Sequence, residues 1–187
     1  MEFTNRLATV DDIAALDPLI ETSIDVNQRG FLDADQIRSS HAIMGIDRQL
    51  VDDGTYFVVE SDGVIVGCGG WSRRATLYGS DHSEGRDPGL LDPATDPAKV
   101  RAMYTHPDFT RRGIGRLILS LCERAAAREG FTSLQLMATM SGYPLYEAYG
   151  FEPVEPIEDA SGGVPVPLVR MVKRIGVLGT GADSKPG

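Results

Sequence analysis

A strand, a glycine loop and a helix follow one another in the middle of this 187-residue sequence. The predicted strand, residues 100–105, runs through His106-Pro107-Asp108-Phe109 into Thr110-Arg111-Arg112-Gly113-Ile114-Gly115-Arg116. A helix is predicted over 116–129, because its apolar residues recur at helical spacing. Another strand is predicted over 133–138. A strand, a crossover helix and a second strand normally form a parallel pair with a right-handed connection.

The other expected elements lie on both sides of this unit. Strands are expected over residues 3–9, 55–60, 64–73, 151–154 and 164–173, and helices from Asp11 or Asp12, over 33–44, with a further turn through Leu50, and over 144–149. Ser61-Asp62-Gly63 favours a hairpin between two of the strands. Residues 75–98 contain three prolines and several aspartates, so we expect a long surface insertion.

Length and composition limit the function classes. The chain suits a single domain over residues 1–175, and the Gly-rich stretch 176–187 is expected to be a disordered tail. A net charge of -9 argues against a nucleic-acid partner, which needs a basic face. No apolar run reaches the roughly 20 residues of a membrane span. The N-terminus lacks an apolar signal core, so a cytoplasmic protein with no membrane partner is expected.

Cysteine and histidine provide no metal site in the sequence. Cys68 and Cys122 lie in a predicted strand and on the apolar stripe of a predicted helix, where free cysteines are usually core residues. His41, His82 and His106 are scattered along the chain. We therefore expect no bound metal.

The glycine loop has the chemistry of a pyrophosphate site. Gly113 and Gly115 let the backbone turn with its N–H groups exposed. The helix that follows adds unsatisfied N–H groups and the positive end of its dipole. Arg111, Arg112 and Arg116 add forked donors. The alternative is a tight turn that needs glycine and carries solvated arginines. The spacing matches neither a Walker loop nor a dinucleotide fingerprint.

Two segments resemble one known family. Met103-Tyr104-Thr105-His106-Pro107-Asp108-Phe109 with the loop resembles the acetyl-CoA motif of the GCN5-related N-acetyltransferase (GNAT) superfamily, in which the loop reads Gln/Arg-x-x-Gly-x-Gly/Ala. Tyr146-Glu147-Ala148-Tyr149-Gly150-Phe151 resembles the family's closing Tyr-x-x-x-Gly-Phe segment. The order of elements also agrees, so the resemblance extends over about residues 3–173.

This resemblance implies a mixed α/β (α+β) fold. Its central sheet would be mostly antiparallel, with a parallel strand–helix–strand unit for acetyl-CoA and helices on both faces. Acetyl-CoA would be the co-substrate. The residues implied to bind it are Met103, Tyr104, Thr105, Thr110, Arg111, Arg112, Gly113, Ile114, Gly115 and Arg116. The backbone of the first three would pair with the pantetheine arm, and a backbone N–H there would polarise the thioester carbonyl.

Two positions depart from the family pattern. The loop's first residue is Thr110 instead of Gln or Arg, so its side chain offers a single hydroxyl. The Asn that often follows the fifth strand is replaced by Thr139 or its neighbour Met140. The site is therefore expected to depend more on backbone donors and arginines than on these side chains.

Tyr146 is the candidate general acid, because a phenol stays protonated at neutral pH and can donate to a departing thiolate. The alternative is a half-buried helix tyrosine, which is the role we expect for Tyr149. The base is left open among Glu60, Asp81, His82, Glu84 and a water-mediated route. Trp71, Arg73 and Arg74 are candidates for the acceptor pocket, or else a core anchor with two solvated arginines.

The resemblance implies an N-acetyltransferase that transfers an acetyl group to a primary amine of a small molecule or peptide. The amine would attack the thioester directly. A non-catalytic acyl-CoA sensor and a phosphate-binding scaffold unrelated to CoA are the alternatives. Dimers are common in proteins of this kind, so a homodimer is an expectation.

Overall fold

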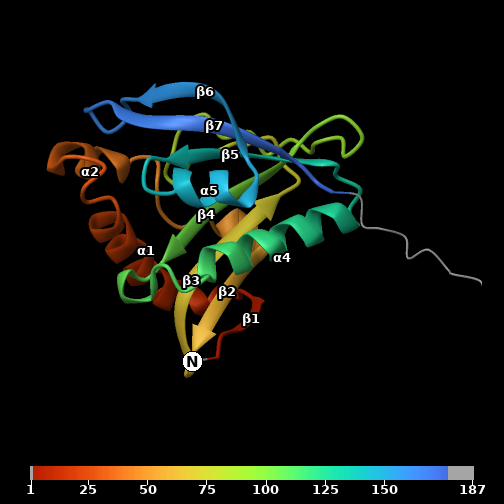
Figure 1. Ribbon diagram of the computed structural model, residues 1–187, viewed down its shortest axis with the longest axis horizontal. Helices are drawn as coiled ribbons and strands as arrows, with labels where there is room; N and C mark the ends of the chain where they lie inside the picture. The colour runs from red at the N-terminus through yellow and green to blue at the C-terminus, as the bar shows by residue number, and fades with distance from the viewer. Residues whose placement is uncertain (1, 177–187) are drawn as a thin grey trace, which may run out of the picture.

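Seven strands form one sheet in the computed structural model, which describes residues 2–176 (Figure 1). The strands are β1 Thr4–Leu7, β2 Tyr56–Ser61, β3 Val64–Ser72, β4 Ala98–Thr105, β5 Ser133–Thr139, β6 Glu152–Asp159 and β7 Val166–Arg174. Their order across the sheet is β1-β2-β3-β4-β5-β7-β6. Every neighbouring pair is antiparallel except β4 and β5, which are parallel. The expected mixed, mostly antiparallel sheet is confirmed.

Helices cover both faces of this sheet. They are η1 Val10–Asp12, α1 Ile13–Asn27, α2 Ala34–Ser40, α3 Arg48–Asp52, η2 Pro107–Phe109, α4 Ile114–Arg128 and α5 Tyr143–Tyr149. Successive residues of a strand point to opposite faces. Val58 packs in the cluster of α1, and Val59 packs in the cluster of α4. The two long helices therefore lie on opposite faces, as Figure 1 shows for α4 across β2 and β3.

The parallel pair at the centre of the sheet is short. Ala98 pairs with Leu134 and Lys99 with Gln135, and no further pairs continue the β4–β5 ladder. Farther along, Ala102 has a φ of 52°, and the β3–β4 register shifts opposite Cys68 to Gly70. Such a bulge bends its strand. The two strands therefore separate towards their C-terminal ends and leave an edge of β4 free.

Most predicted elements occur within a few residues of their expected bounds. The predicted helix over 33–44 is wrong in length, because α2 ends at Ser40 and α3 begins at Arg48. Strand β6 continues to Asp159, well past the predicted end at Val154. It accommodates Pro153 and Pro156 because β6 is an edge strand, where a missing N–H can face away from the ladder.

The insertion contains no strand or helix between Arg73 and Pro97, apart from a bridge between Arg74 and Leu90. The proposed tail over 176–187 lies outside the described residues except for its first position. None of the helices within residues 2–176 is both long and apolar enough to cross a bilayer.

Candidate active site

The backbone of the loop before α4 forms an anion-binding shape. Arg111 has a φ of 60° and Gly113 a φ of 87°, with a residue of negative φ between them. Residues that alternate between left-handed and right-handed backbone conformation point neighbouring N–H groups into one concavity. A Cβ added at Gly113 would meet no atom within 4 Å, so open space lies in front of the loop. Helix α4 begins at Ile114 and aims its first free N–H groups at the same space.

Gly115 has a different role from the one expected. The prediction that it helps the chain turn is wrong, because it lies inside the first turn of α4. A Cβ there would lie 2.6 Å from Cδ2 of Leu145 on α5. The absence of a side chain at Gly115 leaves room for the Leu145 side chain, which packs from α5 onto the start of α4.

The loop's side chains divide into charged and structural groups. Arg111, Arg112 and Arg116 are all exposed, as anion binding requires. The Arg112 guanidinium lies 5.1 Å from the centre of the Phe109 ring, and that of Arg116 lies 5.5 Å from the centre of the Tyr149 ring. The Thr110 hydroxyl donates to the Pro107 carbonyl at 3.0 Å, so it serves the turn.

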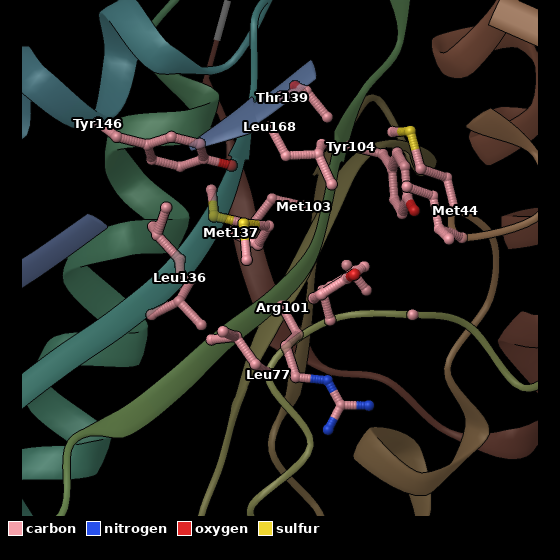
Figure 2. Close-up of a pocket in the computed structure, with 15 residues that line it drawn as sticks. Met44, Leu77, Arg101, Met103, Tyr104, Leu136, Met137, Thr139, Tyr146 and Leu168 are labelled. Carbon is pink, nitrogen blue, oxygen red and sulfur yellow. The ribbon is translucent and has the colours of Figure 1, made fainter. Parts of the chain in front are cut away.

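A cleft opens where β4 and β5 separate (Figure 2). Its cavity volume is about 80 Å³, and it is open to solvent on one side. Its walls come from β4, β5, α5, β7, the α2–α3 segment and the insertion. The lining residues are Ile43, Met44, Leu77, Tyr78, Gly79, Val100, Arg101, Ala102, Met103, Tyr104, Leu136, Met137, Thr139, Tyr146 and Leu168.

The structure brings two of the three predicted β4 residues to this cleft. Met103 and Tyr104 line it, whereas Thr105 does not. The Thr105 carbonyl accepts a hydrogen bond from the Asn27 side chain of α1 at 2.8 Å. Thr105 therefore joins the end of β4 to α1, and its contact with a ligand stays a prediction.

Tyr146 lies in the cleft wall opposite β4. Figure 2 shows its hydroxyl pointing into the pocket among Met103, Met137 and Leu168. Its ring packs against Gly142, where an added Cβ would lie 2.8 Å from Cε2. Burial raises the pKa of Tyr146 to about 12, because the phenolate would lose its hydration. The phenol therefore keeps its proton across the ordinary pH range.

Tyr149, one turn farther along α5, packs and does not line the cleft. Its hydroxyl donates to the Glu123 carboxylate of α4 at 2.7 Å. The same carboxylate is 2.6 Å from Lys173 Nζ of β7. This network joins α4, α5 and β7. These contacts agree with the expectation that Tyr149 packs, and the acid role of Tyr146 stays a prediction.

Each candidate base either bonds to another residue or lies outside the cleft lining. Glu60 pairs with Arg6 at 2.7 Å, near β1. Asp81 accepts from the Arg48 backbone at 2.9 Å, and His82 Nε2 lies 2.7 Å from the His41 carbonyl. Glu84 does not line the cleft. Among the described residues that line it, none is Asp, Glu or His.

The family model for the acetyltransferase (GNAT) domain matches residues 52–153, which is more than half of the chain. This match includes the loop, β4, β5 and Tyr146. The chain belongs to the GNAT acetyltransferase family. No curated protein matches the sequence significantly.

Solved structures agree with this GNAT assignment at the level of the fold. A GCN5-related N-acetyltransferase from Rhodopseudomonas palustris is 18% identical with a TM-score of 0.69, covering 91% of this chain and 94% of that one. PaiA N-acetyltransferase from Thermoplasma acidophilum, solved with coenzyme A, is 15% identical with a TM-score of 0.64, covering 93% and 99%. YncA, a putative acetyltransferase from Salmonella typhimurium solved with acetyl-CoA, is 20% identical with a TM-score of 0.60, covering 98% and 99%.

Trp71, Arg73 and Arg74 do not line the cleft of this GNAT domain. Trp71 is 2% exposed in the core and packs edge-on against Phe131. Arg73 pairs with Glu129 at 2.6 Å, and Arg74 pairs with Asp53 at 2.7 Å. The core-anchor alternative therefore holds for Trp71, and both arginines are paired.

A buried ion group beneath the cleft was missed by the sequence analysis. Asp47 is fully buried and pairs with Arg101 of β4 and, at 2.9 Å, with Arg86 of the insertion. Burial of a carboxylate requires such partners. The three members of this ion group are far apart in sequence and match no motif, so no local signal could have revealed them. The group fixes the insertion and the α2–α3 segment against β4.

Proposed function

We propose that this protein transfers the acetyl group of acetyl-CoA to a primary amine of a small molecule or peptide. The observation that carries the proposal is the free edge of β4, which lies in the cleft opposite Tyr146 and leads along the chain into the anion-binding loop at Gly113. A long ligand with a pyrophosphate at one end and a thioester at the other could use the loop for its pyrophosphate and the cleft for its thioester. The GNAT structures solved with coenzyme A and acetyl-CoA support the choice of ligand.

The residues present fit acetyl-CoA. The left-handed residues Arg111 and Gly113 and the start of α4 would hold the pyrophosphate through backbone N–H groups. The exposed arginines would add charge. The unpaired edge of β4 near Met103 offers backbone groups to the amides of the pantetheine arm, as an edge strand does to an added strand.

The transfer needs one bond made and one broken. The amine nitrogen forms a bond to the acetyl carbonyl carbon, and the bond from that carbon to the CoA sulfur breaks. The thiolate gains a proton from the Tyr146 hydroxyl, whose raised pKa keeps it protonated until then. The nitrogen loses its proton to water, and water returns a proton to the Tyr146 phenolate. Because the described lining holds no carboxylate or imidazole, the amine would enter in its neutral form.

Release of CoA thiol across a panel of amines tests the proposal. We expect saturable, amine-dependent release that matches the acetylated amine formed. Saturable binding of acetyl-CoA without turnover on any amine would instead support the sensor alternative. Binding of other nucleotides with no preference for acetyl-CoA would favour a general phosphate-binding scaffold.

A further inference from the structure

Strand β4 contains an extra residue at the point where it separates from β5. The β3–β4 ladder is regular on both sides of Gly69, but Ala102 and Met103 of β4 both lie opposite that single glycine. Ala102 has a φ of 52°, which is unfavourable for a residue with a Cβ. A bulge leaves its extra residue outside the ladder and bends the strand. The bulge conformation therefore needs support from elsewhere in the fold.

That support comes from β2, on the far side of β3. The Tyr56 hydroxyl donates to the Ala102 carbonyl at 2.8 Å. Tyr56 is fully buried, and burial raises the pKa of its phenol well above the ordinary value, so the hydroxyl stays a donor. A carbonyl displaced from a ladder needs such a donor, because a buried carbonyl without a partner is costly.

Strand β3 lies between Tyr56 and β4, and Gly70 makes room for the ring to pass. Gly70 pairs with Tyr56 on one side and with Arg101 on the other. A Cβ at Gly70 would lie 2.8 Å from Cδ2 of Tyr56 and 3.1 Å from its Cα. A side chain there would displace the ring from its path to Ala102. A glycine of β3 and a tyrosine of β2 thus act together on the bulge.

The bond to Ala102 also fixes the next N–H group along β4. The Ala102 carbonyl and the Met103 N–H belong to one planar trans peptide group, in which they point in opposite directions. The Met103 N–H therefore points away from Tyr56. Figure 2 shows the Met103 side chain in the cleft, on the side of Tyr146. Rotation of this peptide group would turn the N–H out of its present direction.

We propose that Tyr56 is a positioning residue for acetyl transfer, which holds the Ala102 carbonyl so that the Met103 N–H faces the thioester carbonyl of acetyl-CoA. This inference rests on the proposed acetyl transfer and assigns a role in it to a residue that does not line the cleft. When the amine attacks, negative charge develops on the thioester oxygen, and an N–H aimed at that oxygen stabilises it. Tyr56 contacts neither substrate and acts through one peptide group.

Infrared spectroscopy of bound acetyl-CoA, with an isotopic label in the thioester carbonyl, tests this role. A hydrogen bond to that carbonyl lowers its stretching frequency, and no acceptor amine is needed. The natural protein is compared with Tyr56→Phe, which keeps the ring and removes the hydroxyl. Tyr149→Phe is the matched control, because that hydroxyl bonds Glu123 outside the cleft. Calorimetric titration gives the acetyl-CoA affinity of each variant, and only folded protein contributes to the bound signal.

A second variant separates positioning from a general loss of stability. Ala102→Gly is added to Tyr56→Phe, because glycine adopts a positive φ without the penalty of a Cβ. The bulge should then form again without the tyrosine hydroxyl. A defect caused only by a weakened core would not be repaired by this glycine.

Tyr56→Phe should lose about half or more of the frequency shift and ~10-fold in kcat, because the donor is misdirected and not removed. Acetyl-CoA affinity should change less than about threefold, since the loop at Gly113 would still bind the pyrophosphate. The added Ala102→Gly should recover at least about threefold in kcat, together with part of the frequency shift.

An unchanged carbonyl frequency in Tyr56→Phe would overturn the inference and leave acetyl transfer standing, even if kcat fell. The absence of any frequency shift on binding to the natural protein would overturn it as well. Acetyl-CoA binding by the natural protein with no turnover on any amine would overturn acetyl transfer itself. The carbonyl frequency would still decide whether Tyr56 directs the Met103 N–H.

Discussion

The two sides of the cleft are built by different means. The co-substrate side consists of β4, the loop and α4, which are consecutive in sequence, and its function depends on backbone conformation at Arg111 and Gly113. The other side, called the acceptor side because the proposed amine would enter there, joins α2, the insertion and the β6–β7 turn, which are far apart in sequence. Side-chain contacts such as Asp47 with Arg86 and Ser39 with Val164 hold it together.

This difference explains what each side can contribute to chemistry. Backbone N–H groups bind phosphate whatever the neighbouring side chains are, so the co-substrate side can follow a short motif. The acceptor side supplies shape and an apolar lining. Among the described residues of the cleft wall, none carries a carboxylate or an imidazole. The acceptor's own ionisation should therefore control much of the rate.

The largest expected effect is that of pH on kcat/KM for the amine. An acceptor with a pKa near 10 is neutral in about one molecule per thousand at pH 7 and in about half of the molecules at pH 10, so kcat/KM should rise roughly 500-fold between them. Because the pKa of Tyr146 is about 12, the phenol stays protonated up to pH 10. Its ionisation should therefore not reverse the rise in kcat/KM. Rates across the pH range with amines of different pKa test this. A midpoint that stays fixed near neutrality would reveal a protein base.

Loss of the buried carboxylate should destabilise the acceptor side strongly. Asp47→Ala leaves Arg101 buried without its partner, and we expect a loss of about 3 kcal/mol in the free energy of unfolding, measured by urea denaturation. The control is Asp81→Ala, whose pair with Arg48 is more exposed and should contribute under about 1 kcal/mol. Equal losses for the two variants would contradict the role given to the buried group.

Tyr146→Phe removes the proposed acid without removing the ring that packs on Gly142. Its kcat should fall by ~100-fold, with KM for acetyl-CoA little changed. Tyr149→Phe serves as the matched control, because that hydroxyl bonds Glu123 outside the cleft. Full turnover by Tyr146→Phe at saturating acetyl-CoA would exclude the proposed role.

Gly113→Ala tests the backbone of the co-substrate side. The φ of 87° disfavours a residue with a Cβ by about 1–2 kcal/mol, so acetyl-CoA affinity should fall by ~10-fold as the loop relaxes. Since no atom lies within 4 Å of the added Cβ, steric overlap with the protein cannot account for the loss. Calorimetric titration measures the change, and unchanged affinity would count against the anion-binding loop.

The smallest effect is expected for Thr110→Val. Its hydroxyl is already used by the Pro107 carbonyl, so acetyl-CoA affinity should change less than about twofold. Thermal unfolding should show a loss of about 1 kcal/mol, because one hydrogen bond of the turn is removed. A loss of affinity as large as that of Gly113→Ala would show that this side chain, and not the backbone, contacts the ligand.

The sequence predicted the strand–loop–helix unit and the family because their signals are local. Periodicity predicted α4, and the loop motif with the Tyr146 segment predicted the family. The same reasoning gave Gly115 the wrong role, because its contact with Leu145 on another helix leaves no mark in the loop itself. It also began α4 two residues late, at Arg116 instead of Ile114.

The acceptor side could not be predicted in the same way. Trp71, Arg73 and Arg74 are adjacent in sequence and suggested a pocket, yet they pack and pair elsewhere. Ser39 of α2 and Gly162 of the β6–β7 turn approach closely although more than a hundred positions separate them in sequence. Such contacts depend on the whole fold, and no spacing rule connects them.

A single-turnover reaction tests direct acetyl transfer most directly. The protein, in excess over acetyl-CoA labelled in the acetyl group, is mixed with hexylamine, and the label is followed in the thioester, the protein and the amide. We predict that the label passes from the thioester to the amide with no labelled protein in between, and that Tyr146→Phe slows this step. Label that stays in the thioester, or that accumulates on the protein, would contradict the account.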